Sequence, residues 1–342
     1  MKILVGMSGG VDSTYAVQKL LLEGHTVEGA VLKMHEHTEL SAARMAARNV
    51  GVVLHEIDCT EMFEKIVKEN FVTEYTKGRT PNPCIICNEK IKFKYLYEYA
   101  RKHGFDRIAT GHYAKIRSFA SEGKTRYALS VADDLKKDQS YMLYRLPQEI
   151  LSILCLPLAD SEKSDIRVKA RESGISAADR KDSQEICFLP NGAHADFVES
   201  RAGKSPRGDF VDENGRILGR HNGIVRYTVG QRKGLGISLG ERMFVTEINP
   251  LNNTVTLAPR LNGSRVVRVS DMVYSGMPRP LEDSVVSLYA KLRYTASVIP
   301  AKVHLFTDGT ALLELSEPQK AAPGQSAVLY SEGAVMCGGF ID

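Results

Sequence analysis

The chain has 342 residues, of which 43% are hydrophobic and 25% charged, with a formal net charge of +4. This length predicts two or three domains, and the composition suits ordinary globular cores. No run approaches the roughly 18 apolar residues of a membrane span and no signal-peptide pattern precedes the first expected strand, so we expect a cytoplasmic protein with no membrane partner. Six unevenly spaced cysteines argue against a disulfide framework and for metal or redox chemistry.

The first motif is a glycine turn between a strand and a helix. Residues 2–6 form a short apolar run that predicts a buried strand, and residues 13–22 carry apolar side chains at helical spacing. Between them lies Ser8-Gly9-Gly10-Val11-Asp12-Ser13. The unpaired N–H groups and the dipole of a helix N-terminus favour an anion there, and the glycines allow close approach. A plain turn that opens a helix is the alternative interpretation.

This turn lacks the Gly-Lys-Ser/Thr ending of a Walker P-loop. It resembles the SGGxDS loop of the ATP pyrophosphatase (PP-loop) family, which binds the β,γ-pyrophosphate and cleaves ATP between the α and β phosphates. The resemblance implies ATP as the nucleotide and a role for Asp12 in placing Mg²⁺.

Strands and helices alternate over the next segment. Apolar runs predict strands at 26–32 and 52–58, and helical patterns follow at 40–49 and 62–75. This alternation predicts a doubly wound parallel sheet, in which ligands bind at the carboxyl ends of the strands. Leu32 ends the second strand, so we expect it near the adenine; core packing is the alternative.

A C-x-x-C motif, Cys84 to Cys87, precedes a predicted helix from about residue 90 to 103. Helix termini and cations stabilise a thiolate, and Arg79, Lys90 and Lys92 lie nearby in the sequence, so the motif suits reactive cysteines. A zinc half-site and two ordinary buried thiols are the alternatives, and the absence of a second C-x-x-C weakens the zinc interpretation.

The strand predicted at 106–114 ends in Gly111 and His112 at the ligand-binding edge of the sheet. Gly111 allows close approach of a nucleotide, and His112 could reach a substrate phosphate or base; a structural histidine is the alternative. A polar loop at 136–141 and a helix at 162–173 follow. Cys187 lies between polar and apolar flanks, which alone favours a core position.

Residues 201–240 carry eight basic and three acidic residues, an excess of five positive charges. Such a surface suits a polyanionic partner, and a merely solvated face is the alternative. Within it, the segment 230–240 combines four glycines with Arg232 and Lys233, so its backbone can lie against a phosphate.

Beyond residue 205 the pattern changes to short alternating strands with Gly/Pro turns. We expect strands at 208–212 and 213–217, a hairpin of 245–250 with 254–258, and barrel strands at 287–294, 301–306, 311–315 and 326–330. The predicted domains are therefore 1–203, 204–265 and 266–342: an α/β domain with a doubly wound parallel sheet, a small β-rich central domain and a C-terminal β-barrel.

Eight motifs together resemble the tRNA-specific 2-thiouridylases, in the same order and over nearly the whole chain: 8–13, 82–88, 110–113, 137–141, 182–188, 228–236, 293–294 and 323–328. Two features depart from the family pattern. Cys84 stands where many members have aspartate, and the segment after Leu32 is shorter than in many relatives.

The resemblance implies a sulfurtransferase that adenylates the C2 oxygen of the tRNA wobble uridine and replaces it with sulfur, releasing AMP and pyrophosphate. Cys187 would carry a persulfide, Cys87 would form a disulfide with it, and Asp12 would complete the catalytic set. A cysteine desulfurase or a sulfur-relay protein would donate the sulfur. The target base must leave the anticodon stack for C2 to be reached.

The resemblance also assigns three sets of binding residues. The nucleotide set is Gly6, Met7, Ser8, Gly9, Gly10, Val11, Asp12, Ser13, Leu32 and Gly111. The target-base set is Asn82, Pro83 and Cys84. The tRNA set is His112, Lys137, Asp138, Gln139, Arg293, Tyr294 and Gln325.

Other mechanisms and functions stay open at this stage. Cys84, Cys87 and Cys187 could instead hold a [4Fe–4S] cluster by three irons, although such clusters normally have four thiolates. We favour the persulfide because it needs only the matched pair and no anaerobic assembly. A PP-loop ligase that amidates an adenylated small molecule and a nucleotide sensor without chemistry are the alternative functions; the cysteines and the basic β-rich tail count against the ligase.

Overall fold

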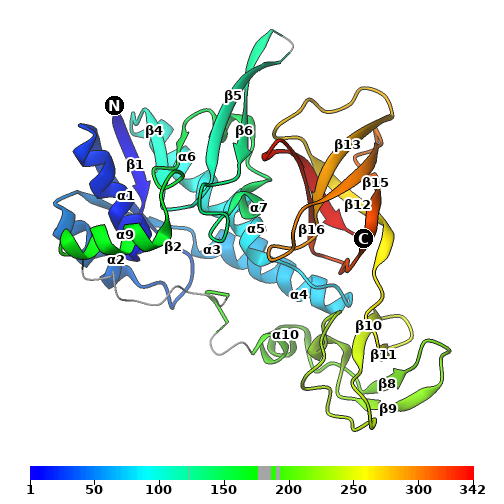
Figure 1. Cartoon of the computed structure of the whole chain (residues 1–342). Helices are drawn as coiled ribbons and strands as arrows, with labels where there is room; N and C mark the ends of the chain where they lie inside the picture. The colour runs from blue at the N-terminus through cyan, green and yellow to red at the C-terminus, as the bar shows by residue number, and fades with distance from the viewer. Residues whose placement is uncertain (122, 176–185, 190–192) are drawn as a thin grey trace.

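Three β-sheets organise the chain in the computed structural model, which describes residues 1–121, 123–175, 186–189 and 193–342 (Figure 1). The first sheet has the order β3-β2-β1-β4-β7 and is parallel throughout. Its strands are β1 (Lys2–Gly6), β2 (Thr26–Lys33), β3 (Leu54–Asp58), β4 (Arg107–Thr110) and β7 (Leu154–Cys155). No helix among the described residues is long and apolar enough to span a bilayer.

Helices cover both faces of this sheet, as a doubly wound fold requires. Ile3 and Val5 pack on one face with α1 (Val11–Leu22) and α2 (Leu40–Val50). Leu4 faces the other way, into the core beneath α6 (Phe93–Lys102). The alternation follows from the two-residue period of a strand. Between β1 and β4 the strand order reverses, which opens a crevice at their carboxyl ends. The predicted doubly wound sheet is confirmed.

Two long helices contain a wider turn of π-helix. The first runs through α3 (Thr60–Phe63), η1 (Glu64–Lys68) and α4 (Glu69–Thr76), close to the predicted 62–75. The second runs through α5 (Pro83–Cys87), η2 (Asn88–Lys92) and α6.

The second helix begins earlier than we predicted. Asn82 caps it by accepting a hydrogen bond from the Cys84 N–H (3.2 Å), and Pro83 fits the first helical position. The C-x-x-C motif therefore lies inside the first helical turn and not on the approach to it.

The central sheet has the order β10-β11-β8-β9. After α9 (Lys163–Glu172) and α10 (His194–Ala202) come β8 (Gly208–Val211), β9 (Ile217–His221), the short 3₁₀ turn η5 (Ile224–Arg226), β10 (Phe244–Asn249) and β11 (Thr254–Ala258). The predicted hairpin is confirmed as β10–β11. The strand predicted at 213–217 is wrong: Asp212 Oδ1 accepts hydrogen bonds from the N–H groups of Asn214 and Arg216, which closes a turn there.

The C-terminal strands close into the predicted barrel, because β12 pairs with both β15 and β17. The strands are β12 (Ser264–Val273), β13 (Ser284–Lys291), β14 (Ile299–Leu305), β15 (Ala311–Gln319), β16 (Ser326–Ser331) and β17 (Ala334–Ile341). A hairpin from the first unit, β5 (Lys115–Ser121) and β6 (Lys124–Ser130), extends this sheet through the pair Ala334–Ser130. The sequence did not predict this hairpin, β12 or β17.

A short helical segment joins the barrel to the second long helix. It consists of α7 (Ser140–Leu143) and α8 (Gln148–Leu151). The Tyr141 hydroxyl donates to the Ser326 carbonyl (2.9 Å). Arg145, whose side chain is 5% exposed, donates to Glu89 (2.5 Å) and to Asp271 on β12 (2.9 Å). Its guanidinium therefore connects the wide turn after Cys87 to the barrel.

We predict that Arg145→Met destabilises the fold by about 3 kcal/mol, because the largely buried Glu89 carboxylate loses its buried guanidinium partner and keeps only the half-exposed Lys90 ammonium. The matched control is Arg220→Met, which breaks the exposed pair with Asp209 at a cost of at most about 1 kcal/mol. Urea-unfolding midpoints of the two variants measure the difference. Equal midpoints would show that the Arg145 connection contributes nothing beyond a surface pair.

Candidate active site

The glycine loop lies at the carboxyl edge of the sheet, between β1 and α1. Gly10 is the N-cap of α1, and the loop closes on itself through the Ser13 hydroxyl, which donates to the Gly10 carbonyl (3.1 Å) and accepts from the Ser8 N–H (3.2 Å). Gly9 has φ of +80°, and a Cβ there would lie 2.6 Å from the backbone of Ala42. Among the described residues, no side chain caps this helix N-terminus, and its use as an anion site stays a prediction.

The end of β4 abuts this loop. A Cβ on Gly111 would lie 2.7 Å from backbone atoms of Asp12 and Ser13, so only glycine permits the approach. Two of the other residues assigned to the nucleotide, Met7 and Leu32, are buried in the cores on the two faces of the sheet. Leu32 thus packs in the core at the end of β2, which is compatible with either interpretation of it.

Asp12 is held by two side chains that the sequence did not single out. The Lys163 ammonium donates to both of its carboxylate oxygens (2.5 Å each), and the Tyr113 hydroxyl donates to Oδ1 (2.7 Å). Lys163 is nearly buried and begins α9, where its charge opposes the helix dipole. A lysine in the first turn of a predicted helix was the signal that could have identified it.

The three motif cysteines differ in exposure. Cys87 is buried, with its Sγ 3.7 Å from the Met34 sulfur, and Cys84 is half-buried in the same helical turn. Cys187 is exposed and is anchored by its neighbour Phe188, whose ring packs against Phe63 at 5.7 Å. Residues 182–185 of the motif around Cys187 lie outside the described part of the chain.

Lys92 links these cysteines electrostatically. Burial raises the pKa of Cys87 to about 12, and the ammonium of Lys92 acts against that shift. Although the Cys187 residue is partly exposed, its neighbours shield the thiol from water, which raises the pKa of Cys187, and again Lys92 opposes the shift. Burial opposes the charge of Lys92 as well, but interaction with Cys87, Cys84 and Cys187 outweighs it and raises the pKa of Lys92. A cation therefore stands among three thiols.

The position of Lys92 follows from the wide turn η2. Two side chains five residues apart lie on different faces of an α-helix. In a π-helical turn the backbone hydrogen bonds join residues five apart, so the two side chains lie nearer to one face. Lys92 follows Cys87 by five residues, and η2 covers the interval between them. The sequence named Lys92 only as one of several nearby cations.

These residues do not form a metal site as they stand. Among the described residues, no group of three or more His, Cys, Asp or Glu side chains lies close enough together to hold a metal ion. Cys84, Cys87 and Cys187 all interact with Lys92, but they do not form such a ligand set. Asp12, the expected Mg²⁺ residue, has both oxygens bound by Lys163. We therefore derive no step through an iron–sulfur cluster or Mg²⁺.

His112 connects the two halves of the site. It follows Gly111, and its ring packs on Phe93, the residue after Lys92, at 5.5 Å. Burial, with the charge of Lys92, lowers the pKa of His112 to about 3, so the ring is neutral at physiological pH. Its Nδ1 and the Thr110 hydroxyl share a hydrogen bond of 2.8 Å.

Three of the expected tRNA residues use their side chains within the chain. Asp138 is buried and accepts hydrogen bonds from Ala132 N–H and from Ser140. Gln139 accepts from the Tyr113 N–H (3.0 Å), and Gln325 donates to the Thr80 carbonyl (2.7 Å). These contacts hold the polar loop at 136–141 and the barrel in position. The Asp138 side chain is buried, so it offers a tRNA almost no surface.

Arg293 and Tyr294 are exposed on the turn after β13. The Tyr294 ring lies 6.2 Å from Tyr141 on α7, and the Lys291 ammonium lies over both rings at 5.7–5.9 Å. The barrel therefore presents cations and an aromatic face beside the segment that carries Lys137, a composition suited to RNA.

We predict that Gly9→Ala costs about 3 kcal/mol of stability, whereas Gly24→Ala costs about 1 kcal/mol. Both glycines have φ near +80°, so both substitutions carry the left-handed penalty, but the added Cβ meets Ala42 at Gly9 and open space at Gly24. Thermal unfolding of the two variants measures the difference. Equal losses would mean that the loop does not press against α2.

Comparison with known proteins agrees with this arrangement. Three family models match successive parts of the chain: a tRNA methyl transferase HUP domain (residues 1–191), a tRNA methyl transferase PRC-barrel domain (195–259) and an aminomethyltransferase β-barrel domain (264–341). The tRNA-specific 2-thiouridylase MnmA of Clostridioides difficile is 40% identical, over 100% of this chain and 98% of the relative. The proteins of that name from Acetivibrio thermocellus (40%, over 99% of each) and Treponema denticola (38%, over 100% and 98%) are similar.

The family models are described as methyl transferases, whereas the full-length relatives are described as 2-thiouridylases. Cysteines beside a cation are typical of reactive thiol sites, so the cysteines around Lys92 agree with the second description. The match extends over 100% of this chain and 98% of the relative, and so over all three structural units. The chain belongs to the family of tRNA-specific 2-thiouridylases.

Proposed function

We propose that this protein is a tRNA 2-thiouridylase, which uses ATP to adenylate the C2 oxygen of a wobble uridine and then replaces that oxygen with sulfur. One observation carries the proposal. Gly111 touches the glycine loop, and the next residue, His112, packs on Phe93 beside Lys92. The residue that contacts the anion site and the residue that packs beside the cysteine site are therefore neighbours at the end of β4.

The nucleotide half of the reaction makes C2 reactive. The C2 oxygen is a poor leaving group, and transfer of AMP to it, with loss of pyrophosphate, makes it a good one. The N–H groups at the start of α1 receive the phosphates, and the ammonium of Lys163 supplies a cation next to them. Asp12 binds that ammonium, and the Tyr113 hydroxyl holds the Asp12 carboxylate, before the nucleotide binds.

The sulfur half uses two cysteines. A Cys187 persulfide attacks C2 with its terminal sulfur, and AMP departs with the original oxygen. The Cys87 thiolate then attacks the Cys187 sulfur; the persulfide S–S bond breaks, and its electron pair stays on the sulfur bound to C2. The product is 2-thiouridine and a Cys87–Cys187 disulfide, which a thiol reductant reopens. Lys92 favours the Cys87 thiolate against its burial.

The target base enters at the first turn of α5. Asn82 and Cys84 lie there with Cys87, and the exposed Arg293 and Tyr294 on the barrel are placed to hold the RNA around the base. A cysteine desulfurase or a sulfur-relay protein supplies the persulfide to the exposed Cys187. The amide-forming ligase and the sensor have no use for these cysteines and the RNA-facing turn.

We predict that ATP is split to AMP and pyrophosphate, and that the split depends on unmodified tRNA. Lys163→Met and Asp12→Ala should each reduce the rate at least about 100-fold, because removing preorganised charge from a phosphate site has effects of that size. Chromatography of the nucleotides measures the products. The control variant is Tyr97→Phe, which lies outside this site and should bind ATP as the wild type does. ADP and phosphate as products would contradict the assignment.

We predict that Cys87→Ser and Cys187→Ser abolish thiolation, whereas Cys84→Ser keeps most of it. The persulfide mechanism needs only the first two thiols, and Cys84 lines the base pocket. Iron content and 2-thiouridine are measured on the same anaerobically reconstituted samples, with iron-free protein and a persulfide donor as the reference.

The same samples decide between the persulfide and the cluster. Iron-free protein that thiolates tRNA, together with an active Cys84→Ser, excludes a role for the cluster. If activity needs about four irons per chain and Cys84→Ser loses both iron and activity, the persulfide mechanism is wrong.

A further inference from the structure

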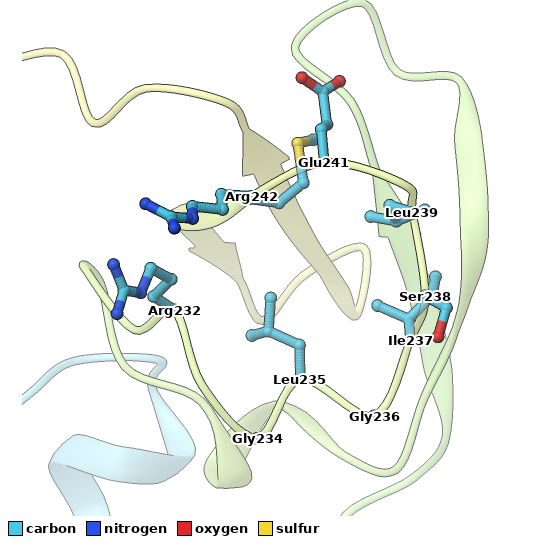
Figure 2. A pocket seen from close by; sticks show the side chains of 10 residues that line it. Arg232, Gly234, Leu235, Gly236, Ile237, Ser238, Leu239, Glu241 and Arg242 are labelled. Carbon is cyan, nitrogen blue, oxygen red and sulfur yellow. The ribbon is translucent and has the colours of Figure 1, made fainter.

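The central unit contains a pocket that the proposed chemistry does not use. Its volume is about 480 Å³, and it lies in the loop between η5 and β10 (Figure 2). Backbone of two glycines, apolar side chains and two arginines line it: Gly234, Gly236, Leu235, Ile237, Leu239, Met243, Arg232 and Arg242. Figure 1 shows this unit away from the sheet that carries the glycine loop.

The two arginines line the same side of the pocket. Figure 2 shows the side chains of Arg232 and Arg242 on that side, while the Glu241 carboxylate points away from them. Both arginines are exposed, and within the described residues neither has a hydrogen-bond or ion-pair partner. Two like charges held near each other gain electrostatic free energy when an anion binds between them.

The other arginines of this region are mostly neutralised. Arg201 pairs with Glu64, Arg220 with Asp209 at 2.9 Å, and Arg226 with Asp196 and Glu199. These three arginines are three of the eight cations of residues 201–240. Arg207 and Arg216 do not line the pocket, so what distinguishes Arg232 and Arg242 is that both lie at one pocket without an acidic partner among the described residues.

Hydrogen bonds hold both ends of the loop. The Gln231 side chain accepts from the Thr228 N–H (3.0 Å) and donates to the Lys233 carbonyl (3.0 Å), and the Val245 N–H donates to the Gln231 carbonyl (2.9 Å). Leu235 and Met243 are buried beneath the loop. The anchored ends and the buried apolar side chains limit the conformational entropy that the loop loses on binding, which favours an anion site at its two guanidinium groups.

We infer that Arg232 and Arg242 together bind one backbone phosphate of the substrate tRNA, in a part of the molecule other than the anticodon loop. This inference rests on the proposed function. A guanidinium pair suits a phosphodiester, because the forked donors of each arginine match its oxygens. The target base is held by the first unit and the barrel, so a site on the central unit contacts a different segment of the same RNA.

The test compares the double variant Arg232→Gln/Arg242→Gln with a control of equal charge, Arg216→Gln/Arg220→Gln, on the same unit. Binding of full-length unmodified tRNA is measured over a series of salt concentrations. The pocket variant should lose about tenfold in affinity, and its log–log salt slope should become shallower by about 0.7 to 0.9, the value for one phosphate. The control should stay near wild type, and ATP affinity without tRNA should stay unchanged in both.

An isolated anticodon stem-loop locates the contact on the RNA. Its affinity should be the same for wild type and the pocket variant. If full-length tRNA binds both proteins equally, or if the stem-loop loses as much affinity as full-length tRNA, the inference is wrong. A wild-type protein that binds tRNA with the predicted pattern but forms no 2-thiouridine would overturn the proposed function and leave the phosphate site standing.

Discussion

The proposed active site depends on the close approach of the end of β4 to the glycine loop. Only a glycine at position 111 allows the backbone of β4 to lie against Asp12 and Ser13, and this contact sets how far His112 reaches toward the cysteine helix. The reversal of strand order between β1 and β4 creates the space for it. The glycine loop and the cysteine helix are therefore contacted by consecutive residues at the end of β4.

Two lysines tune the two halves of the site. Lys163 is nearly buried against Asp12. Lys92 stands among thiols whose burial raises their pKa, and its charge opposes that shift. A buried ammonium is costly unless it is paired, so both positions indicate a functional demand for positive charge. The barrel and α7 hold the cysteine helix from the other side through Arg145.

The sequence predicted the architecture well because its signals are local: short apolar runs, helical periodicity and glycine turns. It also identified the glycine loop, Gly111 and the three cysteines, which lie in short motifs. It missed Lys163 and Tyr113, which meet Asp12 from distant segments. It did not predict the wide turn η2 that places Lys92, since a π-helical turn depends on packing and has no pattern of its own. It assigned Asp138 to tRNA, although its side chain is buried by contacts that only the fold reveals.

The most direct test of the central claim is nucleoside mass analysis of unmodified tRNA after incubation with the purified protein, ATP and a persulfide donor. The proposed mechanism predicts 2-thiouridine at the wobble position, with AMP formed in equal amount, and no product when ATP is left out. A methylated nucleoside, thiolation without ATP, or AMP release with no sulfur in the RNA would contradict it.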